Sequence, residues 1–258
     1  MVHDKPVIVI VHGAWQRPSQ YDALKQGLAS QGFSVVQPES ATAGTVISEV
    51  CGKTYLDDVT VIRAAVEQPL AAGKEIVLVC HSYGGIPDSA AAEGYQVHER
   101  HEKGLPGGIK HIVYLAAFAL PEKGMSLLSA IGGTYAPFMN NEGGVISLGQ
   151  GAQDALFNDS DSETANRLLA GCVYQSTASL ETPSMFAATD VSVPKTYVAC
   201  ENDHALPFDA QIVMSNALGN FTNVIKVRSG HSVYQNMEVL PEVLAAIETA
   251  AASYFGLC

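Results

Sequence analysis

The sequence has little positive charge. Its 14 Lys and Arg residues stand against 26 Asp and Glu residues, which gives a net charge of −12. A nucleic acid is a polyanion and would be repelled by such a protein, so we expect no nucleic-acid partner. Only 16% of the residues are charged and 47% are hydrophobic, so the chain has ample material for a buried core.

Long apolar runs are also missing. The longest runs, such as residues 112–120, are far below the roughly 20 residues that a membrane-spanning helix needs. Residues 1–6 lead directly into a strand-like run, without the basic and apolar regions of an export signal. We therefore expect no membrane association and a cytoplasmic protein.

Paired cysteines and metal-binding motifs are absent as well. The cysteines are odd in number and widely scattered, without a Cys-x-x-Cys pair, so we expect free thiols. There is no His-Glu-x-x-His, no Gly-x-Gly-x-x-Gly and no phosphate-binding Gly-Lys-Ser/Thr. We therefore expect no metal ion and no cofactor. The cysteines are Cys51, Cys80, Cys172, Cys200 and Cys258.

What the sequence does contain is an alternation of apolar runs and helical patterns. The runs are nearly continuous in apolar residues, which is typical of strands buried on both faces. They lie at residues 6–11, 34–37, 75–79, 111–115, 195–200 and 223–227. Helical patterns lie at residues 19–31, 55–72, 84–99, 208–218 and 238–254. This order predicts an α/β fold with a mostly parallel central sheet flanked by helices.

Residues 121–193 break this rhythm. They are rich in Gly, Ser, Asn and Asp, and roughly 70 residues without a strand pattern are too many for a plain connection. We expect an inserted helical cap, or lid, on a core made of residues 1–120 and 194–258. Large apolar residues scattered in it, among them Phe138, Met139 and Phe186, are expected to shape an apolar substrate pocket.

Ser82 is the strongest candidate for a nucleophile. It follows the apolar run of residues 76–80 and precedes two glycines and a helix of small residues. In such a strand-to-helix turn the backbone is strained and the hydroxyl is held at the N-terminus of the helix. Cys80 occupies the first position of the usual Gly-x-Ser-x-Gly pattern, where a small side chain fits. The alternative is an ordinary glycine-rich turn.

A serine nucleophile needs a base, which a carboxylate in turn orients. Asp203 comes just after the fifth strand-like run and His231 just after the sixth, so both are expected at the carboxyl edge of the sheet. The order Ser82, Asp203, His231 is that of the α/β-hydrolase fold. Glu201 and Asp209 are alternative carboxylates, and His231 could instead be a surface histidine.

The other histidines are expected to have no catalytic role. His81 is expected to pack against the sheet, and His204 either lines the mouth of the pocket or faces water. His98, His101 and His111 lie in a charged stretch and are expected to be solvated.

The first strand-like run ends in His-Gly-Ala-Trp, on the same edge as Ser82. We expect the backbone N–H groups of Ala14 and Tyr83 to form an oxyanion hole. The residues expected to bind substrate are Gly13, Trp15, Phe118, Phe138, Met139, Phe186 and His204.

Taken together, the motifs resemble the α/β-hydrolase superfamily, and within it the compact branch of plant methyl esterases and hydroxynitrile lyases. The motifs are His12-Gly13-Ala14, His81-Ser82-Tyr83-Gly84-Gly85, Leu115-Ala116-Ala117-Phe118 and Asp203-His204-Ala205-Leu206-Pro207 with Gln211. The resemblance implies a cap over the serine and hydrolysis of small esters or lactones.

We therefore expect a serine hydrolase that cleaves a small, largely apolar ester or lactone through an acyl-enzyme. Lyase, cyclase or dehydratase chemistry with the same three residues is an alternative, and so is a ligand receptor on the same scaffold. The lyases of the similar branch have a threonine where this chain has Gly13 and a lysine where it has Ser232, which favours hydrolysis. The expected partner is a small-molecule substrate, and a homodimer is left open.

Overall fold

The central feature of the computed structural model, which describes residues 5–253, is a six-stranded sheet. All its strands are parallel, in the order β10-β9-β5-β4-β1-β2. The strands are β1 (Val7–Val11), β2 (Val35–Val36), β4 (Glu75–His81), β5 (Gly108–Leu115), β9 (Lys195–Cys200) and β10 (Thr222–Val227). The predicted α/β fold with a mostly parallel sheet is confirmed.

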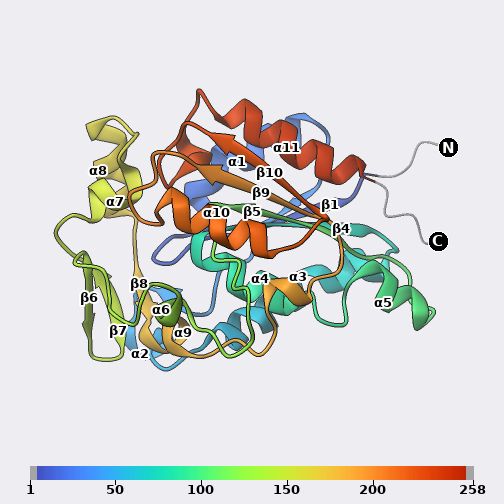
Figure 1. The fold of residues 1–258 in the computed structure, drawn as a ribbon, viewed down its shortest axis with the longest axis horizontal. Coiled ribbons are helices and arrows are strands. Elements are labelled where there is room, and N and C mark those ends of the chain that lie inside the picture. The colour runs from blue at the N-terminus through green and yellow to red at the C-terminus, as the bar shows by residue number, and fades with distance from the viewer. Residues whose placement is uncertain (1–4, 254–258) are drawn as a thin grey trace.

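Helices cover both faces of this sheet (Figure 1). On one face α1 (Asp22–Ser30) and α11 (Leu240–Ala252) bury apolar side chains against residues such as Ile8 and Ile10 of β1. On the other face α3 (Tyr55–Ala71), α4 (Gly85–Ala91) and α10 (Phe208–Ala217) pack against the alternate residues of the same strands. Because successive strand residues point to opposite faces, a strand that is apolar throughout needs helices on both sides.

The helix predicted for residues 84–99 is two helices. After α4 the chain turns at Gly94, which has a φ of 76°, and α5 (Val97–Glu102) follows. His111, expected to be solvated, is buried in β5, where its Nε2 lies 2.9 Å from Thr196 Oγ1. Burial lowers the pKa of His111 to about 4.

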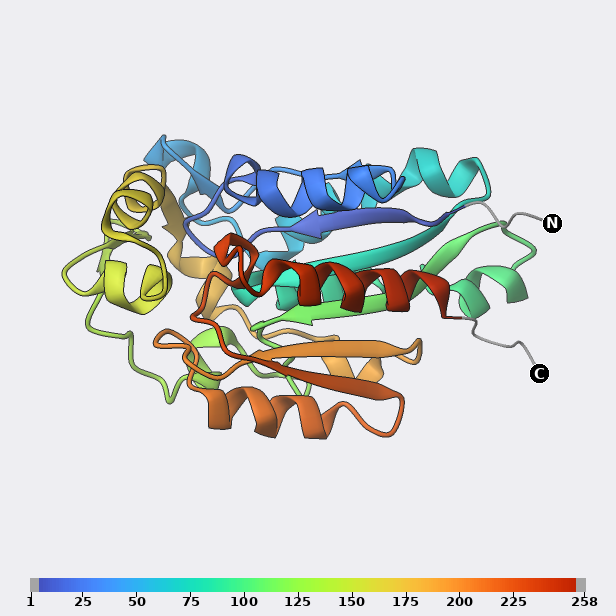
Figure 2. The same cartoon turned by 90° about the horizontal axis from the view of Figure 1, so that it is seen from above.

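The cap segment (residues 121–193) lies at the end of the molecule toward which the strands of the central sheet point (Figure 2). It contains α6 (Leu127–Ala130), β6 (Met139–Glu142), β7 (Val145–Leu148), α7 (Ala152–Phe157), α8 (Ser162–Ala170), β8 (Tyr174–Ser176), α9 (Thr177–Glu181) and the 3-10 helix η3 (Ala188–Asp190). Its strands form an antiparallel sheet of order β3-β8-β7-β6, whose β3 (Ala43–Gly44) comes from the core.

Those cap strands were not predicted, because they are short and two of them lack apolar alternation. β6 reads Met-Asn-Asn-Glu and β8 has three residues. The insertion therefore combines helices with an antiparallel sheet.

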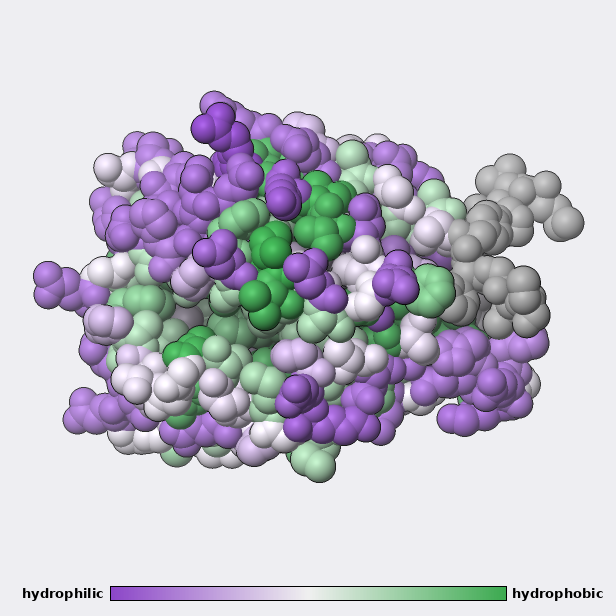
Figure 3. All heavy atoms as spheres, in the orientation of Figure 1, coloured by the Kyte–Doolittle hydropathy of each residue, from purple (hydrophilic) through white to green (hydrophobic). Residues whose placement is uncertain are grey.

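On the face shown in Figure 3, apolar residues gather over α10 and β10 and hydrophilic residues lie around them. No helix within residues 5–253 is long and apolar enough to cross a membrane. Within the same range, no group of three or more His, Cys, Asp or Glu side chains could hold a metal ion. The cysteines at 51, 80, 172 and 200 are free, and Cys258 lies outside the described residues.

Asp88 on α4 is an unusual core residue. It is fully buried, and neither carboxyl oxygen has a hydrogen-bond partner among the described residues. Burial raises the pKa of Asp88 well above its usual range, and the neighbouring Cys80 thiol lowers it only in part. The carboxyl group is therefore protonated in the folded protein at pH values where the unfolded chain has lost the proton.

This raised pKa predicts that Asp88→Asn stabilises the protein near neutral pH. At about pH 4 and below, the carboxyl group of Asp88 is protonated in both the folded and the unfolded protein. As the pH rises, only the unfolded chain ionises, so the wild-type protein loses stability. Each unit by which the pKa is raised removes about 1.4 kcal/mol from the free energy of unfolding. The gain in Tm should therefore grow from pH 4 to pH 8. A contrasting variant is Asp58→Asn, which should destabilise. Burial raises the pKa of Asp58 as well, but its carboxyl oxygens accept hydrogen bonds from the Thr42 N–H and from the Thr42 and Tyr83 hydroxyls, and an amide loses at least one of these. A gain at Asp88 that does not depend on pH would contradict the argument.

Candidate active site

Ser82 lies at the turn between β4 and the 3-10 helix η2 (Ser82–Gly84), with a φ of 52°. A serine in this left-handed region is strained, which is the geometry of a nucleophile elbow. The turn needs glycines because neighbouring backbone lies so close. A Cβ at Gly84 would lie 2.8 Å from Val11 O, and one at Gly85 would lie 2.7 Å from Phe118 O.

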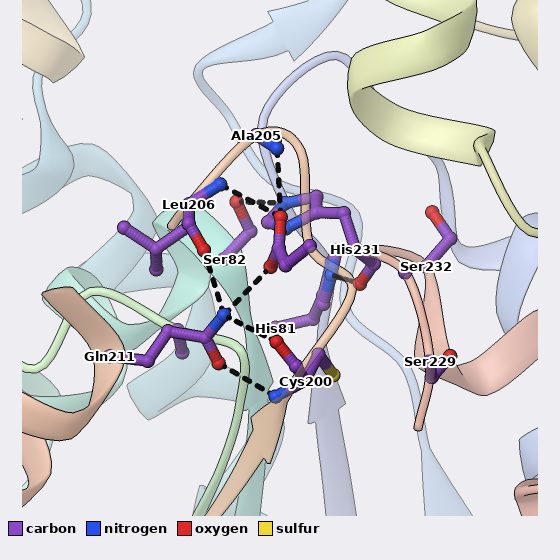
Figure 4. A network of polar contacts seen from close by, with 12 residues as sticks. His81, Ser82, Cys200, Ala205, Leu206, Gln211, Ser229, His231 and Ser232 are labelled. Carbon is purple, nitrogen blue, oxygen red and sulfur yellow. Dashed lines mark hydrogen bonds and ion pairs between the residues drawn. The ribbon is translucent and has the colours of Figure 1, made fainter. Parts of the chain in front are cut away.

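The three residues predicted as a triad lie in one hydrogen-bonded chain. Ser82 Oγ is 2.9 Å from His231 Nε2, and His231 Nδ1 is 2.8 Å from Asp203 Oδ2. All three are buried. Figure 4 shows Ser82 and His231 turned toward each other at the carboxyl ends of the strands.

The surroundings of Asp203 fix the tautomer of the imidazole. Its Oδ1 accepts hydrogen bonds from the N–H groups of Ala205 and Leu206, each at 2.8 Å, and its Oδ2 also accepts one from Gln211 Nε2 at 3.1 Å. Three N–H groups already donate to this carboxyl group, so it acts as an acceptor, and a proton on His231 Nδ1 completes the contact between the two side chains. His231 Nε2 is then free to accept the Ser82 proton.

The alternative carboxylates lie elsewhere. Glu201 and Asp209 are both exposed, and neither contacts His231. Among the described residues, Asp203 is the only carboxylate hydrogen-bonded to the imidazole.

The side chain of His81 is hydrogen-bonded to the backbone of His231. Because a carbonyl oxygen only accepts, His81 Nε2 donates to His231 O at 2.9 Å. His81 Nδ1 lies 2.7 Å from Tyr21 Oη, which donates to Gln16 Oε1. Burial lowers the pKa of His81 well below its usual value, so the ring is neutral. Tyr21 Oη also accepts the Gly13 N–H at 3.0 Å. His81 thus links the loop of His231 to the loop of Gly13, a role that the sequence did not indicate.

The two predicted oxyanion donors border the same cavity as Ser82. Tyr83 lies in the first turn of η2, where backbone N–H groups have no acceptor within the helix. Its side chain points away, with its hydroxyl 2.7 Å from Asp58 Oδ2. Ala14 is followed by Trp15, whose φ of 62° is held by the cap: Trp15 Nε1 donates to Ile146 O, and Trp15 O accepts from Val173 N.

The cavity above Ser82 has a volume of about 350 Å³ and is mostly apolar. Its lining side chains come from both the core and the cap segment. Apart from Ser82 and His231, the lining residues are Ala14, Trp15, Tyr83, Phe118, Leu127, Ala130, Ile131, Thr134, Ala136, Phe138, Met139, Leu156, Ala205, Leu206, Pro207 and Ala210.

Four of the seven predicted substrate-binding residues border this cavity: Trp15, Phe118, Phe138 and Met139. The other three do not. Gly13 lies behind Ser82, Phe186 packs against the apolar core, and His204 is exposed and lies 3.1 Å from Asp154.

The sequence also missed lining residues, among them Leu127, Ile131, Leu156 and Leu206. They lie in loops and short helices without a periodic pattern. Only Leu206 carried a usable signal, because it belongs to the Asp203 motif.

The chain matches the model of the Alpha/beta hydrolase family over residues 8–243. It belongs to that family. Alpha/beta hydrolase nvfD of Aspergillus novofumigatus is 29% identical over 235 residues, which cover 88% of this chain and 90% of that protein. A carbendazim hydrolyzing esterase of Nocardioides sp. is 27% identical over 260 residues, which cover 93% of this chain and 98% of that protein. Among solved structures, that of polyneuridine aldehyde esterase has a TM-score of 0.74 at 20% identity, and the match covers 95% of this chain and 100% of that one.

The geometry around His231 predicts that, among the nearby carboxylates, only Asp203 affects turnover strongly. Asp203→Asn should lower kcat by roughly 10⁴-fold, because an amide beside Nδ1 favours the wrong tautomer. Glu201→Gln and Asp209→Asn serve as matched controls and should stay near the wild-type rate. The measurement is kcat on the best ester found for the wild-type enzyme, and equal losses in Asp203→Asn and Glu201→Gln would contradict the assignment.

Proposed function

We propose that the protein is a cofactor-independent serine hydrolase that cleaves a small, largely apolar ester or lactone. The observation that carries this proposal is the hydrogen-bonded chain Ser82–His231–Asp203 at the base of an apolar cavity. The esterase among the relatives supports the same chemistry.

In this mechanism Ser82 Oγ attacks the substrate carbonyl while His231 Nε2 takes the hydroxyl proton. The N–H groups of Ala14 and Tyr83 donate to the oxyanion of the tetrahedral intermediate. His231 then gives the proton to the leaving alcohol, and an acyl-enzyme remains on Ser82. Water, deprotonated by the same imidazole, hydrolyses it, and Asp203 stabilises the imidazolium that forms in each half of the reaction.

The lining of the cavity indicates the kind of substrate. A charged acyl or alcohol group would lose its hydration without gaining a charged partner. The polar side chains among the described lining residues are those of Ser82, His231, Tyr83, Thr134 and Trp15, and the Trp15 indole N–H already donates to Ile146 O. The Tyr83 hydroxyl is already bonded to Asp58. Aromatic walls such as Trp15 and Phe138 suit a neutral aromatic or alicyclic group.

Two positions argue against cyanohydrin cleavage. A Cβ at Gly13 would lie 2.8 Å from His81 Nδ1 and 3.0 Å from Ser82 Cβ, so a threonine there would require the site to shift. Ser232 is fully buried, and its Oγ lies 3.2 Å from Tyr234 Oη. Gly13 therefore lacks the hydroxyl group, and Ser232 lacks the ammonium group, that the similar lyases have at these two positions.

The proposed reaction predicts that wild-type protein releases acid from at least one aryl ester or lactone and that Ser82→Ala does not. Loss of one triad member lowers kcat by up to roughly 10⁶-fold. A fluorophosphonate probe should label Ser82, as mass spectrometry of the intact and digested protein would show. The same preparation should release no cyanide from mandelonitrile above the uncatalysed rate.

Two outcomes would overturn hydrolysis. One is cyanide release that disappears in Ser82→Ala while no ester or lactone is turned over. The other is a folded wild-type protein that binds apolar esters without turning them over and without labelling by the probe, which would favour the receptor alternative.

The cavity walls predict that Phe138→Ala changes substrate preference toward bulkier acyl groups, because it removes a side chain that lines the cavity and packs edge-on against Trp15. Loss of apolar contact should raise KM for small aryl esters roughly 10-fold, which corresponds to about 1.4 kcal/mol. Phe186→Ala is the matched control, since Phe186 lies outside the lining. If the two variants have the same KM profile over esters of graded size, Phe138 does not shape the site.

A further inference from the structure

Asp159 of the cap segment holds the loop that carries His231. It lies between α7 and α8, and its Oδ2 accepts hydrogen bonds from Ser229 Oγ at 2.7 Å, Gly230 N at 2.7 Å and Asn236 Nδ2 at 2.9 Å. Two of these donors belong to the residues directly before His231. One carboxylate oxygen of the cap therefore fixes both the backbone and a side chain of this loop.

The contact is close enough to restrict the sequence. A Cβ at Gly230 would lie 2.1 Å from Asn158 Oδ1 and 2.9 Å from Asp159 Oδ1, so the loop meets the cap at a position where only glycine fits without a shift. Asn158 Nδ2 also donates to Asn202 O, next to Asp203, at 2.8 Å. The neighbouring pair Asn158-Asp159 thus contacts the loops of both His231 and Asp203.

The opposite side of the His231 loop is held by the core, through the hydrogen bond from His81 Nε2 to His231 O. The imidazole has to keep one nitrogen 2.9 Å from Ser82 Oγ and the other 2.8 Å from Asp203 Oδ2. The core side of the loop fixes the carbonyl of His231, and the cap side fixes the two residues before it.

We propose that Asp159 is a positioning residue for His231, an inference that rests on the proposed function. Asp159 does not line the cavity, so it has no route to the substrate except through the loop. Without it, the His231 loop can relax away from Ser82, and a displacement of about 1 Å in a reacting group lowers the rate by roughly 10²-fold. The loss falls on kcat, because the walls that bind substrate stay in place.

Three matched variants test this inference. Asp159→Ala removes the acceptor, and Asp159→Asn keeps one acceptor oxygen while it removes the charge. Asp161→Asn is the control: it removes the same charge two residues away, where Asp161 caps α8 through the Thr164 N–H and does not contact the His231 loop.

The expected result is a graded loss. Asp159→Ala should lower kcat roughly 10²-fold with KM nearly unchanged, and Asp159→Asn should lie between it and wild type. The rate of inactivation by the fluorophosphonate probe should fall in parallel, because it depends on the same Ser82–His231 contact. Asp161→Asn should match wild type in all three quantities.

Ser229→Ala tests the contact between Asp159 and the His231 loop from the loop side. It removes the hydroxyl donor to Asp159 and should lower kcat on its own. Combined with Asp159→Ala it should add little, since Asp159→Ala already breaks the hydrogen bond that Ser229→Ala removes. This cycle, with Asp159→Asn, also tests the inference if Asp159→Ala does not fold.

The readouts separate the two proposals. If no ester or lactone is turned over but the probe still labels Ser82, the labelling rates and an NMR signal decide whether Asp159 positions His231. In that case the downfield ¹H NMR signal of the His231 Nδ1–H should weaken or exchange faster in Asp159→Ala than in Asp161→Asn. Unchanged labelling rates and an unchanged NMR signal in Asp159→Ala would overturn the inference, and so would equal losses in Asp161→Asn or a change confined to KM.

Discussion

The hydrogen bond from His231 Nδ1 to Asp203 is the interaction on which the site depends. It holds the imidazole with its other nitrogen toward Ser82, and it needs Asp203 as an acceptor in a buried position. The backbone N–H groups of Ala205 and Leu206 and the amide of Gln211 hold the carboxyl group there by donating to its oxygens. The loop after β9 is therefore shaped around one carboxylate.

The rest of the fold brings three separate chain segments to that carboxylate. A parallel sheet places the ends of all its strands at one edge, so Ser82 after β4, Asp203 after β9 and His231 after β10 meet although they are far apart in sequence. The strain at Ser82 is sustained by the glycines at 84 and 85, where backbone from two other strand ends leaves no room for a side chain.

The cap segment does more than cover the cavity. It contacts the loop of the proposed oxyanion donor through Trp15 and the loop of the base through Asp159. Since the apolar walls of the cavity also come partly from the cap, the segment that shapes the substrate space also holds the loops around it. Under the proposed function, changes in the cap segment would therefore affect turnover as well as substrate choice.

The sequence by itself determined the parallel sheet, because few other folds are compatible with continuous apolar runs that alternate with helical patterns. It also pointed to Ser82, Asp203 and His231 through local motifs. It could not place the residues whose role depends on distant neighbours. Phe138 reaches the cavity whereas Phe186, of the same chemistry, packs into the core, and His81 and Asp159 gain their contacts only when remote segments meet. The short cap strands pair with β3 of the core, so their structure comes from tertiary contact and leaves no periodic pattern in the chain.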